Sequence, residues 1–277
     1  MTTTVALPAT RFTDLLAAEW LKLRSLRSTY WALGAGALAV IALNTNAARA
    51  DYANYPHYGA VIQTHFVSWA LRDAFTQGAA MTMLLVTASI GAITIVGEYS
   101  TGLIRTTFAA VPDRRALMTA KVLVVTAVMT VYGAVVAGAS FAATQAVLDG
   151  RGQGVPISHP GALRVVAASA LLAPVCALVG MALGALIRHS ATTMVLITFV
   201  LLFLPTFVTD RYHWTACLRN ALPFNAWVRL VDIEYGHDPF TLVPRWPTTV
   251  TGGWLVFGAW AVVAAAVTVV AVDRRDV

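Results

Sequence analysis

Long apolar stretches alternate with short polar segments along the chain. Six of these stretches lie at residues 30–48, 74–96, 122–148, 165–187, 191–209 and 253–272. A helix needs roughly 20 residues to cross the hydrocarbon core of a bilayer, and each stretch is about that long or longer. Such runs are too long for barrel strands, and backbone polar groups in lipid must be paired within their own segment. The pattern therefore predicts an all-α integral membrane protein with six transmembrane helices.

The segment before the first stretch has its own helical pattern. Between residues 11 and 29, apolar side chains recur at helical spacing, namely Phe12, Leu15, Leu16, Trp20, Leu23 and Leu26. Lys22 and Arg24 fall on another face, and Arg27 lies where its long stem can reach the interface. We expect residues 1–29 to form an N-terminal unit with an interfacial helix, Trp20 lying at headgroup depth, followed by a six-span domain at residues 30–277. The simpler alternative is a positively charged flank without a helix.

The same N-terminal region also has features of a secretory signal. Basic residues, an apolar run and the tripeptide at 48–50, Ala-Arg-Ala, resemble a signal peptide with its cleavage site. Against this interpretation, the region before the apolar run is about thirty residues long and amphipathic, and the run itself reaches the length of a span. We therefore keep residues 30–48 as the first span.

A polar segment at residues 98–121 separates the second and third stretches. Its first part has an apolar and a polar helical face, Ile104, Phe108 and Val111 against Gly102, Arg105 and Thr106. Pro112 is expected to end this helix, and the Asp113 side chain can then cap a new helix that begins at Arg114. The segment predicts a short amphipathic surface helix, a stop and a restart. A loop of this size that folds back without a special role is the plainer alternative.

The longest polar segment, residues 210–252, is not uniformly polar. Its apolar part, residues 222–231, is too short to span a bilayer. It is expected to dip into the outer leaflet as a re-entrant element or to form a lid on the bundle. Four tryptophans near it suit an interfacial position: Trp214, Trp227, Trp246 and Trp254.

Composition agrees with a membrane protein. Of the 277 residues, 58% are hydrophobic and 12% charged, whereas soluble domains average about 25% charged residues. The net charge of +6 does not indicate nucleic-acid binding, because the basic residues flank the apolar stretches and form no compact patch.

The distribution of Lys and Arg predicts the orientation. Eleven basic residues lie in the segments that include both termini, and eight lie in the opposite set. Both lysines, Lys22 and Lys121, belong to the first set. By the positive-inside rule this set is cytoplasmic, so both termini are expected in the cytoplasm.

Motifs for catalysis on this chain are absent. The sequence has no G-x-x-x-x-G-K-[ST], H-E-x-x-H, C-x-x-C or G-x-S-x-G, so we expect no catalytic residue, no metal site and no cofactor on the chain itself. The six stretches as bounded above contain no Asp, Glu, Lys, Arg or His, which argues against a proton antiporter. A sodium site built from backbone carbonyls would escape this argument.

Residues 98–107, EYSTGLIRTT, followed by Pro112 and Arg114, resemble the loop after the second span of bacterial ABC-2 type transporter permeases. The sequence EWLKLRS at 19–25, with RST at 27–29, is similar to the start of that family. The six spans, the short link between the fourth and fifth, and the long segment before the sixth agree with it over nearly the whole chain.

The resemblance implies a non-catalytic permease subunit of an exporter in the bacterial plasma membrane. It implies a cytoplasmic ABC ATPase that binds ATP and Mg, and a second permease chain that makes a homo- or heterodimer. The coupling candidates are Glu98, Thr101, Arg105, Thr106 and Arg114, with Glu98 bracing the loop against basic residues of the N-terminal helix. Glu98 and Arg105 could alternatively be solvated surface charges. The N-terminal interfacial helix contributes Glu19, Trp20, Lys22, Arg24 and Arg27.

In such a permease the second and fifth spans face their counterparts across the dimer. The candidates for the substrate pathway are Thr87, Thr94, Thr198 and Phe199, and an apolar path dotted with hydroxyls suits a hydrophobic or amphipathic substrate. Hydroxyls in spans usually bond to their own or a neighbouring helix, so packing is the alternative for the threonines.

Two other functions remain open from the sequence. One is a six-span membrane scaffold or immunity protein that does not transport. The other is a sodium-coupled carrier, whose activity would follow the sodium gradient and ignore ATP.

Overall fold

The computed structural model describes residues 11–111, 113–233 and 244–273, which form helices and connecting segments and contain no strand. Six helical segments are long and apolar enough to cross a membrane: Arg27–His57, Phe66–Ser100, Arg114–Asp149, Ala162–Ile187, Ser190–Phe207 and Val250–Val272. Each contains most or all of one predicted stretch. The all-α, six-span prediction is therefore confirmed.

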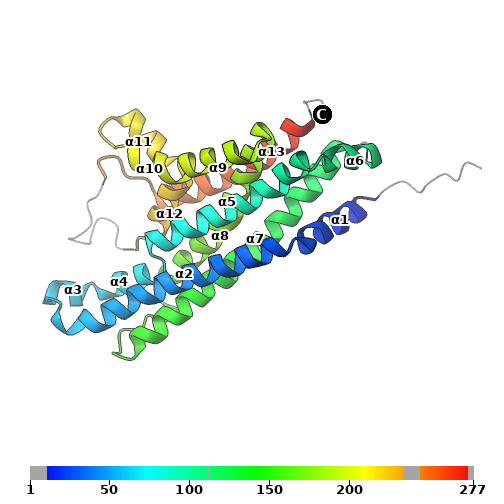
Figure 1. The fold of residues 1–277 in the computed structure, drawn as a ribbon. Helices are drawn as coiled ribbons and strands as arrows, with labels where there is room; N and C mark the ends of the chain where they lie inside the picture. The colour runs from blue at the N-terminus through cyan, green and yellow to red at the C-terminus, as the bar shows by residue number, and fades with distance from the viewer. Residues whose placement is uncertain (1–10, 112, 234–243, 274–277) are drawn as a thin grey trace, which may run out of the picture.

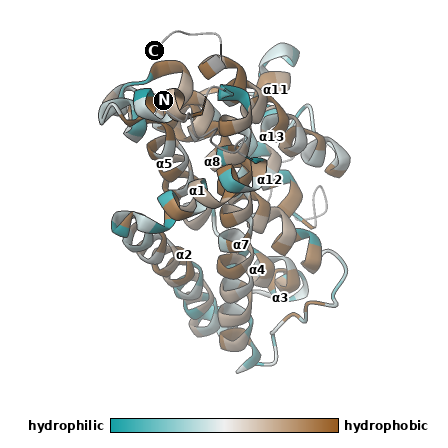
Figure 2. Ribbon diagram, turned by 90° about the vertical axis from the view of Figure 1, so that its right-hand side faces the viewer, coloured by the Kyte–Doolittle hydropathy of each residue, from teal (hydrophilic) through white to brown (hydrophobic). Residues whose placement is uncertain are grey.

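The element order is as follows: α1 (Phe12–Ser25), α2 (Arg27–Asn54), η1 (Tyr55–His57), α3 (Ala60–Thr64), α4 (Phe66–Asp73), α5 (Gln77–Ser100), α6 (Leu103–Ala110), α7 (Arg114–Asp149), α8 (Ala162–Ile187), α9 (Ser190–Thr198), η2 (Phe199–Phe203), α10 (Leu204–Phe207), α11 (His213–Asn220), α12 (Pro223–Val231) and α13 (Val250–Asp273). The bundle has two ends (Figure 1). We call the one with α1, α6 and the end of α13 the α6 end, and the one with α3, α4, α11 and α12 the α12 end. Figure 2 shows hydrophobic residues along the bundle helices.

Helix α8 is the centre of the bundle and contacts α5, α7, α12 and α13. Its crossing with α5 is very close because each helix places a glycine against the backbone of the other. A Cβ added at Gly180 would lie 1.9 Å from the carbonyl oxygen of Ala88, and one at Gly91 would lie 2.0 Å from that of Ala177. The glycines thus allow the two backbones to touch, as small residues do between membrane helices.

The N-terminal helix ends earlier than predicted. The expected single helix reaches residue 29, but α1 stops at Ser25 and Leu26 has an extended backbone (φ −83°, ψ 93°). The Ser25 hydroxyl donates to the carbonyl of Lys22 at 2.8 Å. Arg27 is therefore the first residue of the first membrane helix α2, and its assignment to the interfacial helix was wrong.

Residues 49–73, which lie between the first and second predicted stretches, are largely helical. Helix α2 continues to Asn54, and α3 and α4 follow. Tyr55 and Phe66 pack edge to face with ring centroids 4.7 Å apart, and Phe66 is buried. The hydropathy boundary fell at Arg49 because that residue is charged, yet an exposed charge at a helix end does not interrupt the backbone.

The apolar part of the segment before the sixth span forms helix α12, which packs against α8 and α13. Trp227 is buried, and its Nε1 donates to Ser169 Oγ at 3.1 Å. Whether α12 enters a membrane stays a prediction. Pro112, the predicted helix stop, lies outside the described residues, as do residues 1–10, 234–243 and 274–277.

Candidate functional site

The amphipathic helix predicted after the second span is present as α6 at one end of the bundle. It begins after Gly102, whose left-handed backbone (φ 71°) turns the chain away from α5. Glycine adopts this conformation without steric cost. Ile104 and Phe108 are buried against the bundle, while Arg105 and Thr106 are exposed. The helix is thus fixed on one face and leaves a polar face free for a partner.

The restart after α6 also follows the sequence prediction. Asp113 Oδ1 accepts a hydrogen bond of 2.9 Å from the Ala116 amide and caps α7. The Arg114 guanidinium lies over the Phe108 ring, 5.0 Å from its centroid. Arg114 is therefore held against α6, and Thr101 lies exposed just before that helix.

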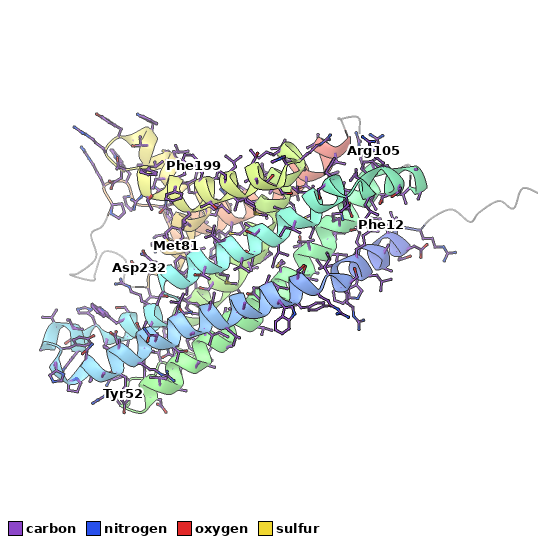
Figure 3. The ribbon with its side chains drawn as sticks, in the orientation of Figure 1. Phe12, Tyr52, Met81, Arg105, Phe199 and Asp232 are labelled. Carbon is purple, nitrogen blue, oxygen red and sulfur yellow. The ribbon has the colours of Figure 1, made fainter. Side chains whose placement is uncertain are left out.

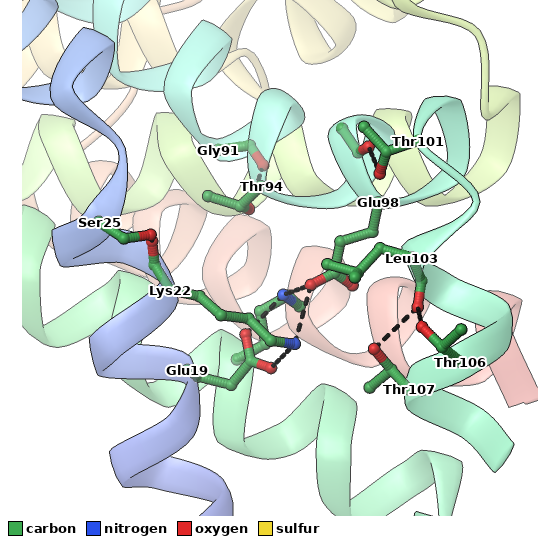
Figure 4. Close-up of polar contacts among 12 residues, drawn as sticks. Glu19, Lys22, Ser25, Gly91, Thr94, Glu98, Thr101, Leu103, Thr106 and Thr107 are labelled. Atoms are coloured by element: carbon green, nitrogen blue, oxygen red, sulfur yellow. Dashed lines mark hydrogen bonds and ion pairs between the residues drawn. The ribbon is translucent and has the colours of Figure 1, made fainter. Parts of the chain in front are cut away.

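Two acidic and two basic side chains meet where α1, α5 and α7 come together (Figure 4). Lys121 Nζ lies 2.5 Å from Glu19 Oε2 and 2.8 Å from Glu98 Oε1. Lys22 Nζ lies 2.7 Å from Glu19 Oε1 and 3.0 Å from Glu98 Oε1. We call Glu19, Lys22, Glu98 and Lys121 the charge cluster. Each lysine bridges both carboxylates, so the cluster is balanced in charge and ties three helices together.

Three of the four cluster side chains are buried. Glu19 and Lys121 are each 3% exposed and Glu98 is 7% exposed, whereas the Lys22 side chain is one-third exposed. The interpretation of Glu98 as a solvated surface charge is therefore wrong, whereas Arg105 is exposed. The expected contact between Glu98 and the N-terminal helix exists through Lys22.

The cluster also corrects the statement that the spans carry no ionisable residue. Helices α5 and α7 extend past the predicted boundaries, so Glu98 and Lys121 lie inside membrane-length helices. A hydropathy pattern places the end of a span at the first charged residue. A charged residue can nevertheless lie in the buried part of a helix when it pairs with an opposite charge. The argument against proton coupling consequently applies only to the middle of the spans.

The electrostatics of the cluster are visible at Lys22, which lies outside the spans. Burial by itself lowers the pKa of a lysine, but hydrogen bonds and the charges of Glu19 and Glu98 outweigh it and raise the pKa above its usual value of 10.5. Lys22 therefore stays protonated at neutral pH.

Sequence reasoning missed Lys121 and the role of Glu19 in this site. Glu19 and Lys121 are 102 positions apart in the chain, and no local pattern connects them. The available signal was the burial stripe of α1, where Leu15, Glu19 and Leu23 follow each other at four-residue spacing and face the bundle. Trp20 and Arg24 on the same helix are exposed.

The candidate substrate-pathway residues do not come together. The Thr87 side chain is fully buried, and its hydroxyl donates to the Met83 carbonyl at 2.9 Å. The Thr94 and Thr198 hydroxyls donate to Gly91 and Met194 of their own helices. Phe199 is 48% exposed and begins the π-helical turn η2, a feature frequent at functional positions. Packing accounts for the threonine hydroxyls, and a pathway role stays a prediction.

Within the described ranges, no group of three or more His, Cys, Asp and Glu side chains is placed to hold a metal ion. Cys176 is buried in α8 and Cys217 is exposed on α11, and both are free thiols.

The model of a family described as ABC-2 family transporter protein matches residues 42–227, about two thirds of the chain. The matched range runs from α2 to α12 and contains α6 together with Glu98 and Lys121. No curated protein matches the chain.

Proposed function

Because the chain belongs to the ABC-2 transporter family, whose members are membrane components of ABC transporters, we propose that it is the permease subunit of an ATP-driven exporter. In this proposal the α6 end faces the cytoplasm, both termini lie there, and the membrane is a bacterial plasma membrane. A second permease chain, identical or different, completes the translocation path. The ATPase partner binds ATP and Mg, and this chain contributes no catalytic group.

The observation that carries the proposal is the way α6 is attached. Its apolar face is buried through Ile104 and Phe108, and its polar face presents Arg105 and Thr106. On one side, Gly102 connects it within a few residues to Glu98 in the charge cluster. A partner that pushes on α6 would therefore move α5 and α7 together rather than bend a loose loop.

The charge cluster is the second support. Breaking a buried ion pair costs several kcal/mol. The cluster therefore holds α1, α5 and α7 together as one unit at this end. We infer that ATP-driven motion of the partner passes through α6 into α5. The fifth span, formed by α9, η2 and α10, contacts α5 and would move with it.

The substrate proposed is hydrophobic or amphipathic. The bundle helices are mostly apolar, and the hydroxyls of Thr87, Thr94 and Thr198 are bonded to their own backbones. A strongly charged substrate would meet no side chain of opposite charge on such an apolar surface.

The first test is co-purification of the ATPase with the chain from native membranes. We expect the ATPase to be retained by the unaltered chain and lost about tenfold with Arg105→Ala, because a charged hydrogen bond at an interface is worth roughly 1.4 kcal/mol or more. Arg49→Ala is the matched control, since Arg49 is an exposed arginine at the opposite end of the bundle.

Equal retention by Arg105→Ala and Arg49→Ala would show that α6 is not the docking element. Absence of any ATPase under conditions that keep other ABC complexes intact would contradict the permease proposal and favour a scaffold.

A further inference from the structure

A cavity of about 280 Å³ opens between α1, α5 and α7, directly beside the charge cluster. Its size is close to the lower limit of ligand pockets, roughly 300 Å³. All four cluster residues line it, together with Leu26, Ile93, Thr94, Gly97, Thr101 and Val125 among others. Neither the fold nor the proposed coupling uses this space.

The cavity changes from polar to apolar along its length. Glu98 and Thr101 lie near the end of α5, whereas Ile93 lies more than one turn deeper in the bundle. On α7, which runs away from the α6 end, Lys121 comes before Val125. The shape therefore suits an amphiphile whose head lies at the charge cluster and whose apolar chain points into the bundle.

Apart from the two lysines, the polar side chains of the wall offer acceptors rather than donors. The hydroxyls of Ser25, Thr94 and Thr101 each donate their hydrogen to a backbone carbonyl of their own helix, so only their lone pairs remain. Glu98 Oε2 is buried and has no hydrogen-bond partner among the described residues. A buried carboxylate oxygen without a partner is costly, so Glu98 Oε2 favours a ligand that brings a hydrogen-bond donor.

Lys22 adds a hydrogen-bond donor to the wall of the cavity. Its side chain is one-third exposed and donates to Glu19 and Glu98, while an ammonium group has three donors. One N–H of Lys22 is thus left for an anionic group at the same mouth of the cavity. The wall therefore offers acceptors for a cation and, next to them, a donor for an anion.

From this arrangement we propose that the cavity binds a membrane phospholipid with a primary amine headgroup, of the phosphatidylethanolamine class. Its ammonium group donates to Glu98 Oε2 and the neighbouring hydroxyl oxygens, its phosphate contacts Lys22, and the start of one acyl chain lies along Ile93 and Val125. The bound lipid supplies the donor that Glu98 lacks and fills the gap between α1, α5 and α7. This inference requires no ATPase partner.

The test uses the purified chain alone, in nanodiscs made from equal amounts of phosphatidylethanolamine and phosphatidylcholine with identical acyl chains. After transfer to detergent, native mass spectrometry counts the lipid that stays bound. Both headgroups carry the phosphate, but only the ethanolamine has N–H donors. We expect about tenfold more phosphatidylethanolamine than phosphatidylcholine, because a hydrogen bond to a charged acceptor is lost in the latter.

Two glycine variants locate the site. A Cβ at Gly97 meets nothing within 4 Å, and Gly97 lines the cavity, so the side chain added by Gly97→Leu occupies this space while all four cluster residues are kept. Gly138→Leu is the matched control, because Gly138 is exposed on α7 and also meets nothing within 4 Å. We expect Gly97→Leu to abolish the headgroup preference and Gly138→Leu to keep it.

Equal retention of the two lipids by the unaltered chain would overturn the proposal, and this comparison needs no variant to fold. Unchanged preference in Gly97→Leu would also overturn it by placing the lipid elsewhere. Loss of the proposed ATPase association leaves both results unaffected, so the two proposals fail separately.

Discussion

Lys121 is the one basic residue with a buried side chain in the part of the chain that the structure describes. It donates to both Glu19 and Glu98, so its removal leaves two carboxylates that share Lys22, whose side chain is one-third exposed. An uncompensated buried charge is far more costly than a lost surface pair. Removing Lys121 should therefore cost more stability than removing Lys22, although both lysines contact the same two carboxylates.

We predict that Lys121→Met destabilises the chain by about 3–5 kcal/mol and Lys22→Met by about 1 kcal/mol. Thermal unfolding of the two variants in the same detergent, followed by the loss of helical circular dichroism, measures the difference. Lys22→Met is the matched control because it removes the same group from the same cluster. Equal shifts in midpoint would show that burial of Lys121 does not determine the strength of the cluster.

The limits of the sequence are also clear at the residue scale. The Asp113 cap and the two faces of α6 were predictable because their signals lie within a few positions of each other. The charge cluster was not, since it joins residues from three helices and a charge normally marks the end of a span. Only its Glu98 contact with the N-terminal helix was expected, and that expectation came from resemblance to a family rather than from spacing.

At the scale of elements, the crossing of α5 and α8 holds the bundle together. Gly91 and Gly180 bring the two backbones into contact, and α8 in turn contacts α7, α12 and α13. The four-residue spacing of Gly180 and Gly184 is typical of close packing between membrane helices. It did not identify α5 as the partner, because a small-residue motif gives the face of one helix only.

We predict that Gly180→Ala destabilises the bundle by about 1–3 kcal/mol, because its Cβ would lie 1.9 Å from the Ala88 carbonyl oxygen and the helices must separate. Gly138→Ala is the control. Its Cβ meets no atom within 4 Å, so the change should be neutral or slightly stabilising through helix propensity. Thermal unfolding of both variants distinguishes a specific contact from a general intolerance of alanine, and equal midpoints would contradict the close crossing.

The element boundaries show where hydropathy fails. The six spans were predictable because lipid demands long, internally paired helices. Residues 49–73 lie outside the predicted stretches, yet α2, α3 and α4 occupy most of them, because polar and aromatic residues at the end of a bundle can also form helices. The break at Leu26 was equally invisible, since no glycine or proline separates the two helices.

At the scale of the whole molecule, the two ends of the bundle differ in character. The α6 end carries the charge cluster, the cavity and a short helix with an exposed polar face. The α12 end is closed by α12, whose Trp227 is buried against α8. This polarity agrees with a partner at the α6 end, which in the proposed function is an ABC ATPase.

The central claim is that the charge cluster transmits the motion of an ATPase from α6 into the membrane helices, and ATP hydrolysis by the reconstituted complex measures it most directly. We compare Glu98→Gln, Lys121→Met and the double variant, which keeps the balanced pair of Glu19 and Lys22. Each single variant leaves one unbalanced charge, so we predict a loss of substrate-stimulated hydrolysis of about tenfold in each and recovery in the double variant. Unchanged hydrolysis in all three, with the ATPase bound, would contradict the claim.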